Sequence, residues 1–224
     1  MNGWNEIDTN EAIAVVESDG FCCIQETSVS SENLLELAGR FGSVVPSRSN
    51  GEPVDELTIR NCDAGRESSL TASYGEGAFP FHTDTAYWTT PARFIALQCV
   101  VPGRATLLFD SRTWALDEGC WRDFENSVFA VKNGRHSFYG NCIAKDATTI
   151  RYDPACMTPK NSAAHSCEEL LAALATQKHD TKRIDWEQGQ IVLIDNWRML
   201  HARSGSDDAT VESPERKLYR VTIT

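Results

Sequence analysis

Two segments near the start of the chain repeat apolar residues at the spacing of a helix. In residues 10–19, Asn10 is a favourable N-cap, Ile13 and Val16 lie on one face, and Gly20 follows. In the second segment the apolar positions follow i, i+3, i+4 and i+7, between Ser30 or Ser31 as N-cap and Gly42 as stop: Leu34, Leu37, Ala38 and Phe41. We therefore expect two amphipathic helices that each pack one face on a core.

Most of the remaining apolar positions form short runs bounded by Gly, Pro or Asn, as in strands. The expected strands are 21–24, 57–59, 93–100, 105–109, 127–131, 190–195 and 217–224. A capping box at residues 166–169 predicts a helix that continues to residue 177. Residues 133–161, broken by Gly and Pro, are expected to form a lid or wall over a site. The pattern predicts one domain over residues 1–224, mainly β with flanking helices, as a β-sandwich or jelly roll.

Composition narrows the possible partners. The net charge of −11 at 224 residues argues against a nucleic-acid or anionic-membrane partner, because like charges repel. We expect a small-molecule substrate instead. The first residues lack the features of a secretion signal, and no apolar run approaches the ~20 residues that span a bilayer. The eight cysteines form no C-x-x-C pair, so we expect reduced thiols and a cytoplasmic location.

One short motif offers metal ligands. If residues 81–85 are extended, His82 and Asp84 point to the same face, because side chains alternate along a strand. His201 follows an apolar strand and is the candidate third ligand. Two imidazoles and one carboxylate on one face of a metal form the site of non-haem Fe(II) oxygenases. His136 is an alternative to His201, whereas two further histidines, His165 and His179, are expected at the surface.

A second group of residues suits a carboxylate. Alternate positions of the last strand hold Arg216, Leu218, Arg220 and Thr222, which places both arginines on one face with about 13 Å between their Cα atoms. Arginines that face a protein interior need an anion, and the planar guanidinium binds carboxylates through two hydrogen bonds. Thr106 offers a hydroxyl on a neighbouring strand. The alternative is that this face lies in solvent and both arginines are surface charges.

Together these residues resemble the taurine dioxygenase/chlorophenoxyacetate dioxygenase family of Fe(II)- and 2-oxoglutarate-dependent oxygenases. The matching pieces, in family order, are residues 36–42, 79–84, 103–110, 150–154, 200–201 and 216–223. The resemblance implies a double-stranded β-helix, a cupin-like jelly roll. It also implies iron ligands His82, Asp84 and His201, with Thr106 and Arg216 on the distal carboxylate of 2-oxoglutarate.

The resemblance also bears on the substrate and the reaction. Arg220 matches the family arginine that receives an anionic group of the substrate, and Tyr87 and Trp88 are expected to wall the pocket, although both suit a core equally well. Asp84 keeps its carboxylate, where related halogenases have a small residue, so oxygenation is expected. The taurine enzyme of the family binds sulfonate through a histidine upstream of the H-x-D motif, and no histidine precedes His82 here, so taurine is not the expected substrate.

The expected activity is O2-dependent oxidation of a small polar or anionic substrate, such as an amino acid, with release of succinate and CO2. Desaturation, cyclisation or epimerisation at the same iron site remains open. Two other classes also remain: a cupin-like protein that binds a metal or small acid without turnover, and a hydrolase or isomerase that uses a divalent metal as Lewis acid. The sequence does not predict the oligomeric state.

Overall fold

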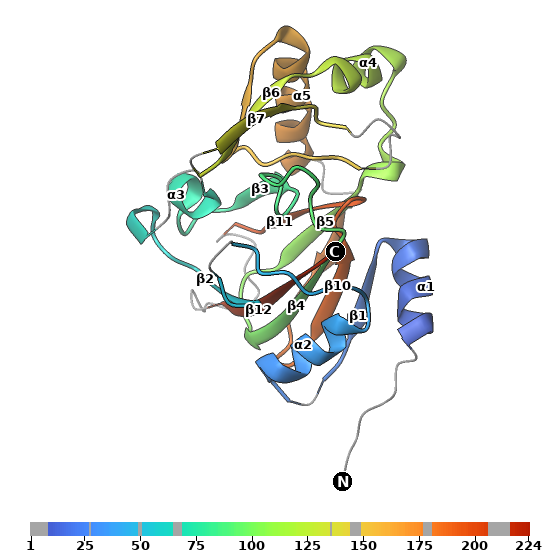
Figure 1. The fold of residues 1–224 in the computed structure, drawn as a ribbon, viewed down its shortest axis with the longest axis vertical. Helices are drawn as coiled ribbons and strands as arrows, with labels where there is room; N and C mark the ends of the chain where they lie inside the picture. The colour runs from blue at the N-terminus through green and yellow to red at the C-terminus, as the bar shows by residue number, and fades with distance from the viewer. Residues whose placement is uncertain are drawn as a thin grey trace.

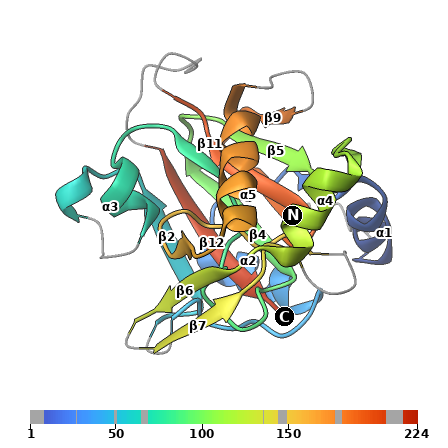
Figure 2. The ribbon, with the colours of Figure 1, turned by 90° about the horizontal axis from the view of Figure 1, so that it is seen from above.

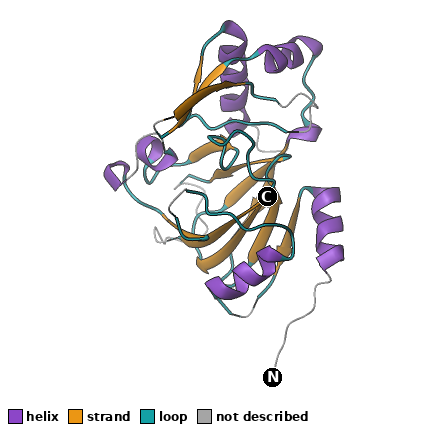
Figure 3. Ribbon diagram, in the orientation of Figure 1, coloured by secondary structure: helices purple, strands orange, loops and turns teal. Residues whose placement is uncertain are grey.

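The computed structural model describes residues 9–26, 28–48, 51–64, 69–134, 136–143, 149–176, 181–205 and 216–224. Its strands form three antiparallel sheets, with helices at the two ends of the molecule and strands between them (Figures 1 and 3). The prediction of a mainly β fold with flanking helices is therefore confirmed.

The largest sheet has five strands in the order β1–β10–β4–β12–β2. Their bounds are Phe21–Ile24, Ile191–Asp195, Phe94–Val101, Lys217–Ile223 and Val54–Thr58. Helices α1 (Thr9–Asp19) and α2 (Ser31–Gly39) cover its outer face. Ala96, Leu193 and Val221 point toward these helices, next to Val16 and Leu34. The pattern along the chain predicted both helices and the strands of this sheet, although the strand expected at 57–59 begins earlier and ends at Thr58.

The second sheet has four strands in the order β3–β11–β5–β9, with bounds Phe79–His82, Met199–Arg203, Thr106–Asp110 and Thr181–Ile184. The inner face of the first sheet contributes Ile95, Leu97 and Val192 to a core that Leu108 and Met199 of the second sheet complete. Alternate residues of β4 and β10 thus enter cores on opposite faces, which explains why every residue of β10 is buried. The two sheets form the sandwich that the sequence predicted.

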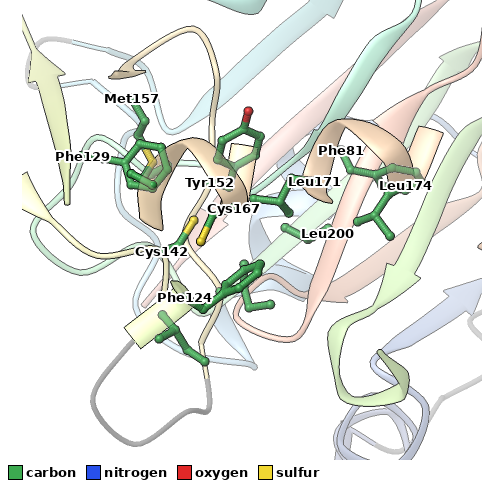
Figure 4. Close-up of a cluster of buried hydrophobic side chains, with 14 of the residues drawn as sticks. Phe81, Phe124, Phe129, Cys142, Tyr152, Met157, Cys167, Leu171, Leu174 and Leu200 are labelled. Atoms are coloured by element: carbon green, nitrogen blue, oxygen red, sulfur yellow. The ribbon is translucent and has the colours of Figure 1, made fainter. Parts of the chain in front are cut away.

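A third sheet and two helices cover the other side of the second sheet (Figure 2). The sheet has the order β7–β6–β8, with bounds His136–Gly140, Phe129–Asn133 and Met157–Pro159, and the helices are α4 (Glu118–Asn126) and α5 (Ser162–Ala173). Phe129 and Leu171 of this layer join Phe81 and Leu200 of the second sheet in one buried cluster (Figure 4). Within the described residues, the section 133–161 is mostly part of this layer.

One helix begins earlier than predicted, and two helices were not predicted. Helix α5 begins four residues before the capping box, because the side chain of Asn161 accepts the N–H of Ala164. Its predicted end at residue 177 lies outside the described residues. Helices α3 (Leu70–Tyr74) and α4 were not predicted, and they begin after the capping side chains of Ser69 and Asp117. None of the helices in the described ranges is long and apolar enough to span a bilayer.

Candidate metal centre and the cavity around it

His82, Asp84 and His201 lie together in the second sheet. Strands β3 and β11 place His82 directly opposite His201, and the ring centroids are 4.3 Å apart. His82 Nε2 lies 3.9 Å from Asp84 Oδ1, and His201 Nε2 lies 3.7 Å from Asp84 Oδ2. All three residues are buried, and among the described residues they form the one group of histidine, cysteine or acidic side chains suited to a metal.

Asp84 reaches this group by a different route from the one predicted. The argument from alternation required extended chain through residue 85, and this condition is not met, because β3 ends at His82 and Asp84 lies in a turn. The next residue, Thr85, has a positive φ of 56°, which is strained for a β-branched side chain. Its hydroxyl donates to Asp84 O (2.6 Å) and accepts from Ala92 N (2.8 Å). These bonds help to hold the strained backbone that turns the carboxylate toward the imidazoles.

Asn196, in the connection between β10 and β11, holds the same turn. It is 1% exposed, its Oδ1 accepts the N–H of Asp84 (2.9 Å), and its Nδ2 donates to Asp84 O (3.0 Å) and Ala92 O (2.8 Å). Thr83 ties the other side of the turn to Ile150 O (2.8 Å). Sequence reasoning did not identify Asn196, whose only signal was its position between a buried strand and His201.

The electrostatics of the three groups suit metal binding. Burial, reinforced by His201, lowers the pKa of His82 to about 3, so the ring is neutral near pH 7. Its Nδ1 donates to Pro80 O (2.9 Å), which leaves the Nε2 lone pair free for a metal. Burial opposes ionisation of Asp84, but Arg220 and His201 outweigh it and hold the pKa of the carboxyl well below its usual range.

The donor set fits an iron(II) ion. Two imidazole nitrogens and one carboxylate are the ligands of the facial triad found in non-haem iron oxygenases. Both donor separations are shorter than two metal–ligand bonds of about 2.1 Å each, so neighbouring donors can share one ion. His201 Nδ1 is buried without a hydrogen-bond partner among the described residues.

Arg216 and Thr106 meet beside the metal centre. Arg216 Nη1 donates to Thr106 Oγ1 (3.3 Å) and to Arg104 O (3.1 Å), and Trp186 Nε1 donates to the same hydroxyl (3.1 Å). Burial lowers the pKa of Arg216 to about 10, and no carboxylate pairs with it among the described residues. Gly103 lies against it, since a Cβ there would lie 2.8 Å from Arg216 Cβ. A buried, unpaired guanidinium beside a hydroxyl is a receptor for a carboxylate.

Arg220 has a different environment. Its Nη1 donates to Asp84 Oδ1 (2.8 Å), and its Nη2 donates to Asp55 Oδ2 (2.8 Å). Asp55 lies on β2, directly opposite Arg220 in the pairing of β12 with β2. The alternative that Arg216 and Arg220 are surface charges is therefore wrong. However, the charge of Arg220 is already met by two acids, a feature that the sequence did not reveal.

The eight candidate residues line one cavity of ≈ 860 Å³, a size typical of ligand sites. They are His82, Asp84, Tyr87, Trp88, Thr106, His201, Arg216 and Arg220. The Tyr87 hydroxyl donates to Ser47 O (2.6 Å), and Trp88 also packs against the core of the sandwich. The alternative His136 is exposed and does not line the cavity, His165 is exposed, and His179 lies outside the described residues.

Two further charged residues of the cavity were missed. Arg203 lies two residues after His201 on β11, is buried, and stacks 3.7 Å from the centre of the Phe79 ring. Burial, together with Arg216, lowers its pKa to about 9. Asp153 lines the cavity from the section 133–161, so that section forms part of the wall as predicted. The alternation of β11 was the available signal for Arg203.

Comparisons with known proteins agree with this geometry. A family model described as "Taurine catabolism dioxygenase TauD, TfdA family" matches residues 2–162 and 121–222. The asparagine oxygenase structure with Fe(II), 3-hydroxyasparagine and succinate superposes with a TM-score of 0.75 at 16% identity, covering 96% of this chain and 78% of the other. A taurine dioxygenase from Burkholderia xenovorans superposes with a TM-score of 0.70 at 16% identity, covering 99% and 83%.

A curated relative is much longer than this chain. Dioxygenase str8 of Strobilurus tenacellus is 25% identical over 203 residues, which cover 82% of this chain and 46% of the relative. The chain thus spans about half the length of that protein. The structural similarities confirm the jelly-roll fold that the resemblance implied.

Proposed function

Because the chain belongs to the TauD/TfdA family of dioxygenases, we propose that it is an Fe(II)- and 2-oxoglutarate-dependent oxygenase. The reaction proposed is oxidation, most simply hydroxylation, of an unactivated C–H bond in a small polar substrate, with release of succinate and CO2. The observation that carries the proposal is the buried triad of His82, Asp84 and His201 in one cavity with Arg216, which pairs with no acid in the described part of the chain.

Each role follows from the contacts of the residue. His82, Asp84 and His201 would hold iron, which supplies the oxidising chemistry together with 2-oxoglutarate and O2. Arg216 and Thr106 would receive the distal carboxylate of 2-oxoglutarate, because their hydrogen-bonding groups converge and no acid within the described ranges pairs with them. The walls of the cavity, Tyr87 and Trp88 among them, would hold the substrate and limit the access of water.

The proposal extends to the class of substrate and to the cellular compartment. An amino acid or another small carboxylate suits a cavity of this size and polarity, and one structural neighbour is described as an asparagine oxygenase in complex with 3-hydroxyasparagine. Arg220 would contact the substrate, with its charge shared by Asp84 and Asp55. The eight cysteines are free thiols, which supports the reducing cytoplasm as the location.

The test is an anaerobic titration of metal-free protein with Fe(II) and 2-oxoglutarate, followed through the visible charge-transfer band of the chelate. We expect the band in wild type and in Asp117→Asn, an exposed control that does not line the cavity, and its loss in His82→Ala; Asp84→Ala should lose turnover with iron and 2-oxoglutarate. A band that persists in His82→Ala, or oxidation of a substrate by Asp84→Ala, would refute the ligand assignment. A band without succinate release in air would support the binding-protein alternative, and turnover without O2 would support the Lewis-acid alternative.

A further inference from the structure

Asp153 is an acid in the cavity that the proposed chemistry does not use. It lines the same cavity as the triad, and its Oδ1 accepts the N–H of Ala155 (2.8 Å). The Cys156 thiol also donates to its carboxyl group. Among the described residues, no lysine or arginine forms an ion pair with it. Its carboxylate is therefore held in position but lacks a countercharge.

In the surroundings of Asp153, a positively charged partner would strongly stabilise the ionised carboxylate. Burial, aided by the charge of the nearby Asp84, raises the pKa of Asp153 to about 6, which opposes ionisation. An ionised carboxylate in such a place is costly unless a cation meets it. A ligand that brings a positive charge would therefore gain more here than at the protein surface.

Arg220 is a weaker receptor for an anionic group of the substrate than the sequence suggested. Arg220 lies between Asp84 and Asp55, at 2.8 Å from an oxygen of each, so an anion would have to compete with two carboxylates. Arg216 and Arg203 pair with no acid among the described residues; the proposed function assigns Arg216 to 2-oxoglutarate, and the Arg203 guanidinium donates to Gly77 O and packs over the Phe79 ring. Asp153 is the acid of the cavity that lacks a basic partner within the same part of the chain.

From this arrangement we propose that the primary substrate carries a protonated amine and that the carboxylate of Asp153 receives it. The proposal rests on the proposed oxygenase function, since it concerns the substrate of that same cavity. It makes Asp153 a specificity-determining residue and favours an amino acid or another amine over a purely anionic or uncharged compound.

Two alternatives to this role of Asp153 must be tested separately: a purely structural role, and an ion pair with a basic residue of the chain. Its hydrogen bond to Ala155 N caps the turn before β8, a structural role that needs only an acceptor oxygen. Asn also provides that oxygen, so Asp153→Asn removes the charge and keeps the cap. Lys132 lines the same cavity and could supply the positive charge from within the chain, which Lys132→Met tests.

The experiment uses wild type, Asp153→Asn, Lys132→Met and the control Asp117→Asn, in which the same change removes a charge from an exposed capping residue. The probes are the L-amino acids, each paired with the 2-hydroxy acid that lacks its amine. Two readouts are recorded at neutral pH: the melting temperature of the metal-free protein with each probe, and succinate release with Fe(II), 2-oxoglutarate and O2.

We expect at least one amino acid to raise the melting temperature and succinate release of wild type, and its hydroxy acid to do neither. Asp153→Asn should keep the charge-transfer band and lower kcat/KM for that amino acid about ten- to a hundredfold, while Asp117→Asn matches wild type and Lys132→Met keeps the preference for the amino acid over its hydroxy acid. Equal responses to both members of each pair, no response to any amine, or full activity in Asp153→Asn would overturn the proposal. Loss of the response in Lys132→Met would also count against it. Absence of the band in wild type would instead refute the oxygenase function.

Discussion

Asn196→Ala should weaken both the fold and the metal centre. The wild-type side chain is buried and makes three hydrogen bonds, of which two clamp the backbone of Asp84 and one holds Ala92 O. A typical hydrogen bond contributes about 1 kcal/mol, and a buried group left without a partner costs ~1–3 kcal/mol. Asp84 O keeps its bond from Thr85, whereas the Asp84 N–H loses its partner. We therefore expect a loss of about 3 kcal/mol in the free energy of unfolding.

Urea unfolding of the metal-free protein measures this loss directly. In a chain of this length, about 3 kcal/mol corresponds to a fall of roughly 6–12 °C in melting temperature. The matched control is Asn126→Ala, because Asn126 is exposed and its side chain donates one hydrogen bond, to Arg122 O (2.7 Å). The control should lose no more than about 1 kcal/mol.

The same variant tests the link between the turn and the metal. Asn196 does not belong to the donor set, but it positions the residue that does, and loss of such support typically lowers metal affinity about 10- to 100-fold. Equilibrium dialysis of Fe(II) against wild type and both variants gives the ratio. Stability of Asn196→Ala within ~0.5 kcal/mol of the control, or unchanged Fe(II) affinity, would refute the reasoning.

Two further predictions concern the cavity. Gly103→Ala places a Cβ 2.8 Å from Arg216 Cβ, so Arg216 must shift; we expect a severalfold or larger rise in the KM for 2-oxoglutarate, whereas Gly39→Ala, with no atom within 4 Å, should leave it unchanged. An unchanged KM in Gly103→Ala would argue against Arg216 as the carboxylate receptor. Because the pKa of Asp153 is raised to about 6, its contribution to stability is full below the unfolded value of about 4 and is lost as pH rises through 6. The stability of Asp153→Asn relative to wild type should therefore improve by about 2 kcal/mol between about pH 4 and about pH 7 in urea unfolding, and a constant difference would contradict the raised pKa.

Sequence reasoning identified the candidate residues better than it identified their geometry. The alternation argument brought His82 and Asp84 together for the wrong reason, since a turn with a strained Thr85 replaces the expected strand. The turn depends on Asn196, which is 112 residues away in the chain, and no local pattern predicts such a bond. Boundaries failed for a similar reason at α5, where a capping side chain at Asn161 competed with the predicted one.

The sequence by itself determined the candidate site residues and most of the helices and strands on which they lie. Periodicity of 3.6 or 2 residues depends only on local geometry, so β10 and helices α1 and α2 could be read directly. The family resemblance assigned the triad and the pair of Arg216 and Thr106, which lie in one cavity.

Only the tertiary structure decided which charges remain free in that cavity. Arg216 and Arg220 look alike along the strand, yet one is unpaired among the described residues and the other lies between Asp55 and Asp84. The section that contains Asp153 was expected to wall a site, but nothing in the sequence showed that Asp153 itself lines the cavity without a basic partner among the described residues. The physical reason is that the state of a buried charge depends on partners from distant strands, and pairing between sheets decides which partners meet.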